Sequence, residues 1–338
     1  MYAFDRPLVL APMAGGPSTP ELCAAVCNAG GLGFLAAGYL RPEQLRAHVD
    51  GVEALTERAY GINLFYPSKP NVDLVDAFEE YRQVLTDGCA GEYDFPSEPQ
   101  WSDDFFDEKL DIALGSRARF VSITFGYPDA ATVARIREAG KLLVLNATTP
   151  REVDHVIGLD CDALGLQGKA AGGHRGSVLD EGEEGYAYDA RELVEYAAAR
   201  TDRLILAGGG VGTAGDVREL LDAGASAVIV GTRFLTAQEA GTKGTHRFAL
   251  VNMKDRGTVV THAFSGKPAR TISNTFAQRF TPFAPLMYPE VHYLTAGMRA
   301  EADSARDAEY LNLWAGEGFH HCREARAKDI MEELLELS

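Results

Sequence analysis

The residues best suited to chemistry surround a single histidine in a glycine-rich stretch. Residues 167–176 read Gln-Gly-Lys-Ala-Ala-Gly-Gly-His-Arg-Gly. Glycines on both sides of His174 would let the backbone press against a ligand and present the imidazole to it. Because its intrinsic pKa is near neutral, an imidazole suits proton transfer or hydrogen bonding to an anion. A histidine in isolation is more often structural, so a catalytic role for His174 depends on where the fold places it.

Two further stretches are suited to binding a phosphate. Residues 207–212 read Ala-Gly-Gly-Gly-Val-Gly, and residues 231–234 read Gly-Thr-Arg-Phe. The glycines Gly208, Gly209 and Gly210 expose N–H groups that no Cβ obstructs, and Thr232 adds a hydroxyl beside Gly231. We expect these two stretches to hold a phosphate together.

Small side chains and two amides complete the set of candidate binding residues. Pro12-Met13-Ala14-Gly15-Gly16 follows the first apolar run, and its small residues would let a flat ring approach the backbone. Asn63 and Gln167 lie at or near the ends of apolar runs, where a buried amide needs a partner. Backbone groups or ligand atoms could supply that partner, and two such amides at one end of a fold favour the ligand.

The elements that must position these residues alternate regularly along the chain. Amphipathic stretches predict helices, among them 19–29 with Thr19 as N-cap, 42–55, 129–139, 150–157, 190–199 and 214–223. Eight short apolar runs predict parallel strands buried on both faces: Leu8–Met13, Gly33–Ala37, Ala59–Phe65, Phe120–Phe125, Lys141–Ala147, Ala163–Gln167, Arg203–Ala207 and Ala227–Val230.

Eight such units favour an α/β fold of the (β/α)₈ TIM-barrel type, with an open doubly wound sheet as the alternative. In a barrel, the loops after the strands form the active site, and those after the last two strands commonly bind phosphate. We expect residues 1–238 to form the barrel and residues 239–338 a helical extension. Its segment Phe280–Tyr293, rich in proline and aromatic residues, suits a cap over the barrel mouth.

Charge and composition exclude several classes of function. The chain has 338 residues, with 49 acidic against 32 basic side chains and a formal charge of −17, which disfavours nucleic acid and anionic lipid as partners. It has neither a long apolar run nor a signal-like N-terminus, so we expect no membrane association and a cytoplasmic location. We expect no metal site, with all the cysteines as buried thiols: Cys23, Cys27, Cys89, Cys161 and Cys322.

Several motifs, in order along nearly the whole chain, resemble those of class I nitronate monooxygenases, also called 2-nitropropane dioxygenases. Two departures are Glu317, where glutamine is expected, and Lys169. Glu317 introduces a possible negative charge near the ligand. The matching motifs are APMAGGPSTPELCAAVCNAGGLGFLAAGY (11–39), GINLF (61–65), TFGYP (124–128), LQGKAAGGHRG (166–176), AGGGVGT (207–213), VGTRF (230–234) and LWAGEG (313–318).

The resemblance implies an FMN cofactor and His174 as the active-site histidine. It also implies oxidation of an alkyl nitronate, such as propionate 3-nitronate, by O₂ to a carbonyl compound and nitrite. The resemblance leaves open whether two copies of the chain form a homodimer. The FMN contacts that it implies are Ala11, Pro12, Met13, Ala14, Asn63, Thr124, Gln167, Gly172, Gly173, Gly210, Val230, Gly231 and Thr232.

Three other functions remain compatible with these residues. An FMN-dependent NAD(P)H reductase, similar to enoyl-acyl-carrier-protein reductase II or to a barrel NADH:quinone reductase, would share the His174 loop and the phosphate glycines. A non-redox barrel enzyme could use the same phosphate loops without a flavin. A flavin-binding protein without nitronate turnover is the third.

Overall fold

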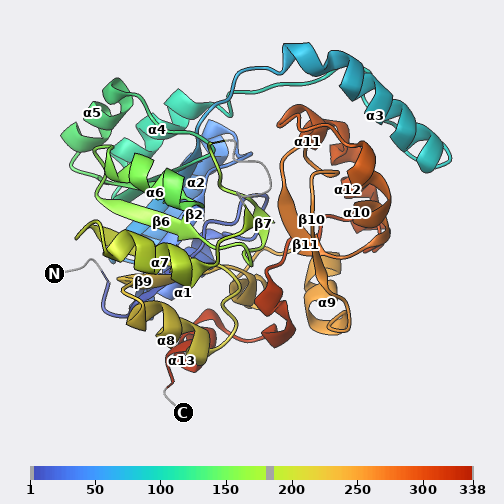
Figure 1. The fold of residues 1–338 in the computed structure, drawn as a ribbon. Helices are drawn as coiled ribbons and strands as arrows, with labels where there is room; N and C mark the ends of the chain where they lie inside the picture. Colours follow the sequence, from blue (N-terminus) through green and yellow to red (C-terminus); the bar gives the residue numbers. More distant parts are fainter. Residues whose placement is uncertain (1–3, 180–185, 337–338) are drawn as a thin grey trace.

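Parallel strands close into a barrel in the computed structural model, which describes residues 4–179 and 186–336 (Figure 1). The strands neighbour one another in the order β1-β9-β8-β6-β5-β4-β3-β2. The Leu32 amide donates to the Leu8 carbonyl and the Leu10 amide to the Leu32 carbonyl, which joins the two ends of this row. The predicted (β/α)₈ barrel is therefore confirmed. Its strands are β1 (Leu8–Leu10), β2 (Gly33–Ala36), β3 (Tyr60–Phe65), β4 (Phe120–Thr124), β5 (Leu142–Ala147), β6 (Ala163–Gln167), β8 (Leu204–Gly208) and β9 (Ala227–Val230).

Helices between the strands cover the outside of the ring. The Thr19 hydroxyl accepts the Leu22 amide at 3.0 Å, so Thr19 is the predicted N-cap. α2 and α6 have the predicted bounds, and the segment between β3 and β4 contains two helices. The helices of this layer are α1 (Pro20–Asn28), α2 (Pro42–Leu55), α4 (Phe106–Gly115), α5 (Ala130–Glu138), α6 (Pro150–Ile157), α7 (Ala190–Ala198) and α8 (Ala214–Asp222).

The strands bury both faces, as their continuous apolar runs predict. On β1, Leu8 and Leu10 belong to the cluster that joins strands and outer helices. Val9 between them packs inside the barrel with Phe34, Phe120 and other inward-facing side chains. The alternation fills the lower barrel with side chains and leaves space for a ligand at the carboxyl ends of the strands.

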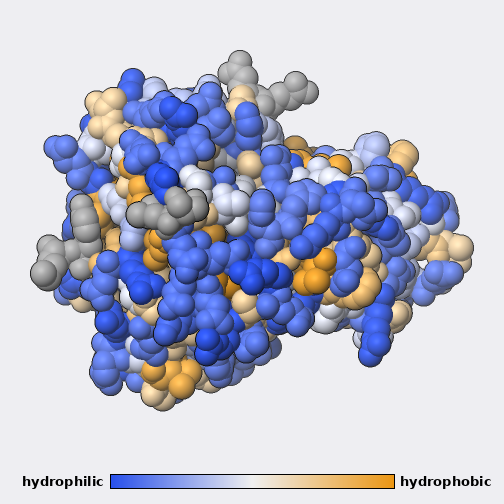
Figure 2. All heavy atoms as spheres, turned by 90° about the horizontal axis from the view of Figure 1, so that it is seen from below, coloured by the Kyte–Doolittle hydropathy of each residue, from blue (hydrophilic) through white to orange (hydrophobic). Residues whose placement is uncertain are grey.

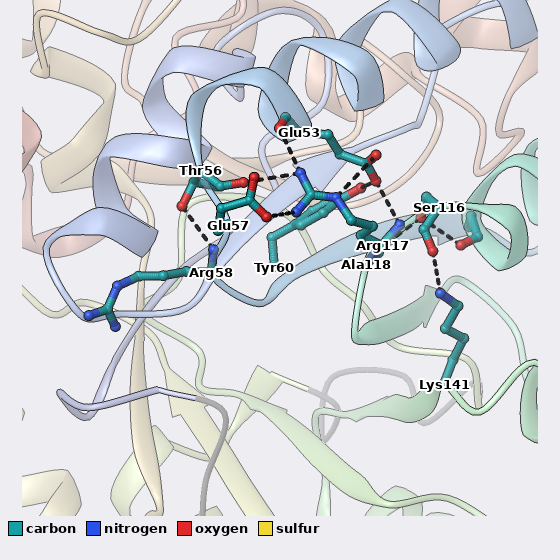
Figure 3. A network of polar contacts seen from close by, with 10 residues as sticks. Glu53, Thr56, Glu57, Arg58, Tyr60, Ser116, Arg117, Ala118 and Lys141 are labelled. Atoms are coloured by element: carbon teal, nitrogen blue, oxygen red, sulfur yellow. Dashed lines mark hydrogen bonds and ion pairs between the residues drawn. The ribbon is translucent and has the colours of Figure 1, made fainter.

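Polar contacts fix the amino-terminal end of the barrel, opposite the mouth (Figure 3). The Arg117 guanidinium, just before β4, donates to the Glu53 carbonyl at the end of α2 and to the Glu57 carboxylate. The Tyr60 hydroxyl, at the start of β3, donates to the Glu53 carboxylate at 2.9 Å. These contacts hold strand starts in place and lie away from the cavity, so we assign them to stability.

Residues after β9 build a second layer beside the barrel mouth, together with α3 (Val75–Gly88) (Figure 1). Phe78 and Tyr81 of α3 pack in one core cluster with Phe264, Phe276 and Met298. The last helix returns to the barrel and packs between α1 and α8. The elements of this part are α9 (Gly244–Asn252), β10 (Thr258–Thr261), β11 (Ala269–Ile272), α10 (Thr275–Phe280), α11 (Glu290–Leu294), α12 (Ala296–Ser304) and α13 (Ala327–Leu335), with short 3₁₀ turns at Val72–Leu74, Thr232–Thr236, Thr281–Phe283 and Glu317–His321.

Two details differ from the sequence-based expectations. The first strand ends at Leu10 and not at Met13, because the Ala11 amide makes the last bond, to Val230, and Pro12 has no N–H to continue it. The extension is not purely helical. β10 pairs with β11, and β11 pairs with β7 (Gly173–His174), a two-residue strand from the glycine-rich loop.

The face seen in Figure 2 is largely hydrophilic, with hydrophobic residues scattered among polar ones. Such a surface agrees with the formal charge of −17. Within the described ranges, no helix is long and apolar enough to cross a membrane.

Candidate active site

A cavity of about 400 Å³ opens at the carboxyl ends of the barrel strands, where the sequence predicts the site. Of the predicted residues, only Val230 does not line it, because its side chain is buried in the core and its carbonyl accepts the Ala11 amide at 2.9 Å. The predicted residues that do line it are Ala11, Pro12, Met13, Ala14, Asn63, Thr124, Gln167, Gly172, Gly173, His174, Gly208, Gly209, Gly210, Gly231 and Thr232.

The glycines after β8 and β9 form one end of this cavity. Gly210 has φ +80°, and a Cβ there would lie 2.8 Å from the Ala170 Cβ. The amides of Gly210 and Gly231 donate to no other residue in the described part of the chain, whereas the Gly209 amide lies at the end of the β8–β9 pairing. The Thr232 hydroxyl accepts the Gly316 amide at 2.9 Å and keeps its own hydrogen for a ligand. Free amides and a hydroxyl are the donors that a phosphate needs.

The LWAGEG motif packs against the histidine loop, backbone on backbone. A Cβ on Gly172 would lie 2.3 Å from the Gly316 amide nitrogen, so the two segments approach as closely as glycine allows. The Glu317 amide also donates to the Ala170 carbonyl at 3.0 Å. The tail of the chain therefore holds the loop that carries His174.

Polar side chains inside the barrel form a connected network below the mouth. Asn63 Nδ2 donates to the hydroxyls of Ser122 and Thr124 at 2.6 and 2.9 Å. Asn146 Nδ2 donates to the same Thr124 oxygen at 2.7 Å. Ser122 and Asn146 also line the cavity but were not predicted, although both lie within predicted strands. The network orients the Asn63 amide and leaves its oxygen without a donor among the described residues.

Gln167 lines the cavity, but the loop backbone already satisfies its amide. Its Nε2 donates to the His174 carbonyl at 3.0 Å, and its Oε1 accepts the Gly176 amide at 2.8 Å. The sequence left open whether backbone groups or ligand atoms would bond this amide, and in the structure backbone groups do so. Gln167 therefore shapes the His174 loop.

His174 reaches the cavity on β7, which β11 holds by antiparallel pairing with Ala269. Its Nε2 lies 2.8 Å from the Ser265 hydroxyl, which is also 3.2 Å from the Lys267 carbonyl. Burial, followed by the charges of Lys267 and Arg299, lowers the pKa of His174 to about 3. The imidazole is therefore neutral at physiological pH, and Nδ1 is the ring nitrogen that no described residue engages.

Aromatic rings surround His174, and two of them, Phe125 and Trp314, line the cavity. The rings of Phe125, Tyr288 and Trp314 all lie within 6 Å of the His174 ring. Tyr288 belongs to the segment predicted to cap the mouth. Phe125 and Tyr39 have φ of +71° and +66°, a left-handed backbone that such residues rarely adopt. Strained backbone held by its surroundings clusters at functional sites.

A buried ion pair fixes one of these strained residues. The Tyr39 amide donates to Asp104 Oδ1 at 3.0 Å, and the other Asp104 oxygen lies 2.8 Å from Lys109 Nζ. The Tyr39 hydroxyl lies 3.0 Å from that of Tyr288. Two loops from distant parts of the chain thus meet over the mouth.

Three charged residues from the sequence motifs do not reach the cavity. Glu317 is 56% exposed and pairs with Arg270 at 3.1 Å, so the negative charge expected beside the ligand points to the outside. Lys169 donates to the Ala187 carbonyl. Arg175 is buried and donates to the carbonyls of Gln167 and Thr148.

Two cations that line the cavity, Lys243 and Arg299, were not predicted from the sequence. Arg299, on α12, lines it together with His292 of α11. Neither stands in a motif, and charged positions on a helix more often face solvent. The five cysteines are all buried and free, as predicted, and no described residues group as metal ligands.

A glycine-lined cavity with a half-buried histidine, at the carboxyl ends of the strands of a parallel barrel, is the arrangement of a barrel enzyme. The model of the nitronate monooxygenase family matches residues 2–336. The chain therefore belongs to the nitronate monooxygenase family and is an oxidoreductase.

Named relatives agree with this assignment. A solved nitroalkane oxidase from Streptomyces ansochromogenes is 39% identical with a TM-score of 0.92, covering 98% of this chain and 95% of that one. A probable nitronate monooxygenase from Bacillus subtilis is 31% identical, over 98% of this chain and 96% of the relative. FabK from Thermotoga maritima, 22% identical over 98% of this chain and 92% of that one with a TM-score of 0.75, shares the fold.

Proposed function

We propose that the protein uses FMN to oxidise alkyl nitronates, such as propionate 3-nitronate, with O₂ to a carbonyl compound and nitrite. The observation that carries this proposal is that β7 and the glycine loops bring His174 and a set of free backbone amides to one cavity. Membership of the nitronate monooxygenase family supports the reaction. The five free, buried cysteines suit a reducing compartment, and we propose the cytoplasm.

The residues present fit FMN. The amides of Gly210 and Gly231 and the Thr232 hydroxyl would hold its phosphate, with Gly208 and Gly209 beside them in the same loop. The small residues Ala11–Ala14 leave room for a flat ring along the backbone, and the Asn63 oxygen is free to accept a ring N–H. When bound, FMN supplies the redox chemistry that no side chain can provide.

The role of His174 depends on which ring nitrogen carries the proton. If Ser265 donates to the Lys267 carbonyl, then His174 Nε2–H donates to Ser265, and Nδ1 presents a lone pair that could take the α-proton of a neutral nitroalkane, a step that a nitronate does not need. If Ser265 donates to Nε2 instead, Nδ1–H can donate to a nitronate oxygen. In both cases Ser265 is a positioning residue and His174 the group that touches the substrate.

Oxygen consumption by the purified protein tests the proposal. The yellow protein should consume O₂ and release nitrite with propionate 3-nitronate, and His174→Gln should keep FMN while losing most of this activity. A colourless protein that cannot be loaded with FMN would exclude a flavin enzyme. Rapid anaerobic bleaching of the flavin by NADH or NADPH, without nitronate turnover, would assign the protein to the reductases.

A further inference from the structure

The charges around the cavity are unusual for so acidic a chain. The protein has 49 acidic against 32 basic residues, yet neither aspartate nor glutamate is found among the described residues that line the barrel-mouth cavity. Two cations line it, Lys243 and Arg299. Lys243 lies 3.4 Å from Asp303, which balances its charge.

Arg299 has neutral partners at every described contact. Its Nε donates to the Thr295 hydroxyl at 3.1 Å and its Nη2 to the His292 carbonyl at 2.7 Å. Its Nη1 lies 3.5 Å from the Asn312 side-chain oxygen. Within the described ranges no carboxylate lies within ion-pair distance of it. Arg299 is half-buried and faces the cavity, and a partly desolvated charge without a counter-ion is costly, so a ligand anion would offset that cost.

The Arg299 guanidinium and the His174 ring line the same cavity. Arg299 Nη2 lies 3.4 Å from His292 Nδ1, and the positive charge of the guanidinium contributes to lowering the pKa of both His174 and His292. Because both histidines are neutral, they cannot balance an anion. Burial lowers the pKa of Arg299 to about 10, so it stays charged at neutral pH.

We propose that Arg299 binds the anionic group of the substrate, a planar group with two oxygens, and thereby makes this cavity selective for anions. A carboxylate and a nitronate share this shape, which matches the planar fork of a guanidinium. The inference rests on the proposed function and deepens it, because it names the residue that would bind the anionic group of the substrate. Arg299 would then set specificity, while His174 acts at the reacting group.

Calorimetric titration with succinate tests the inference without requiring turnover, and succinamide provides a neutral control of similar size. We expect the FMN-loaded protein to bind succinate and not succinamide. Arg299→Gln keeps donors for the His292 carbonyl but removes the charge, and should bind succinate about 100-fold more weakly. Arg299→Lys keeps the charge but loses the fork, and should lose about 10-fold. Arg279→Met, at an exposed position on α10, is the control for net charge and should bind like the wild type.

Steady-state kinetics then shows whether Arg299 binds the carboxylate or the nitronate group of the substrate. If Arg299 holds a separate carboxylate, Arg299→Gln should raise KM for propionate 3-nitronate far more than for propyl 1-nitronate. If it holds the nitronate itself, both KM values should rise alike.

Unchanged succinate affinity in both Arg299 variants would overturn the inference, as would a wild type that does not discriminate succinate from succinamide. A changed flavin reduction potential with unchanged succinate affinity would also overturn it, since the guanidinium would then act on the cofactor. Succinate binding without nitronate turnover would instead leave Arg299 as an anion site and refute the proposed reaction.

Discussion

Gly210→Ala separates the two reasons for a glycine in the phosphate loop. The residue has φ +80°, where an L-residue is strained by about 1–2 kcal/mol. The new methyl would lie 2.8 Å from the Ala170 Cβ, well inside the van der Waals distance of about 3.5–4.0 Å between carbon atoms. The loop must therefore shift, and its amides would move away from the phosphate.

The expected effect on FMN is larger than the effect on folding. Loss of one hydrogen bond to a charged group costs about 1.5–3 kcal/mol, so FMN should bind roughly 10- to 100-fold more weakly. Fluorescence titration of the apoprotein with FMN measures this. The double variant Gly210→Ala with Ala170→Gly removes the clash and keeps the strain, so it should recover part of the FMN affinity.

Gly140→Ala provides the matched control. Gly140 has φ +68°, but nothing lies within 4 Å of its Cβ position, and it does not line the cavity. It should lower the free energy of unfolding by a similar strain and leave FMN binding unchanged. If Gly210→Ala bound FMN as tightly as the wild type, these glycine amides would not hold the phosphate.

Three further predictions concern the histidine and its surroundings. Ser265→Ala removes the partner of His174 Nε2, worth about 1.4 kcal/mol, and should lower kcat about 10-fold at unchanged FMN affinity, as steady-state kinetics would measure. The pKa of His174 is about 3 in the folded protein and near 6.5 when unfolded, so the unfolded chain binds the extra proton between these values and stability falls as pH falls. Between pH 7 and pH 5 the free energy of unfolding of the wild type should fall by about 2 kcal/mol more than that of His174→Gln, as urea titrations would measure. Equal losses would show that the folded protein does not lower the pKa of His174. Glu317→Gln should leave KM, kcat and FMN affinity unchanged, because the carboxylate pairs with Arg270 outside the cavity; a changed flavin spectrum would contradict this placement.

Local patterns predicted the elements whose causes are local. Thr19 before Pro20 marks the start of α1, and the apolar runs mark the strands within a few residues. The order of the strands then placed the glycines after β8 and β9 in the same cavity as His174, because the loops of a barrel converge at one end. All the predicted site residues except Val230 therefore line one cavity, and their role in binding a cofactor stays a prediction.

The parts that could not be predicted depend on contacts between distant segments. β7 exists only because β11, about a hundred residues later, pairs with it. The layer that follows β9 brings Arg299 to the cavity and Ser265 to His174, and no spacing in the sequence relates either residue to His174. Glu317 stands in a motif of the site, yet its side chain turns outward to Arg270, because only its backbone packs against the loop.

The chain has a formal charge of −17, yet neither aspartate nor glutamate is found among the described residues that line the cavity. This difference predicts how salt affects turnover. At about 4 Å and an effective dielectric constant near 20, Arg299 and a bound anion would attract each other by about 4 kcal/mol. The surface charges act through water over a Debye length of about 8 Å at physiological salt, so they chiefly slow the approach of an anion. Added salt should therefore leave kcat/KM for propionate 3-nitronate unchanged or raise it, since it screens the repulsion and not the buried pair. A steep fall in kcat/KM between 0.05 and 0.3 M salt would mean that exposed cations capture the substrate, contrary to the role given to Arg299.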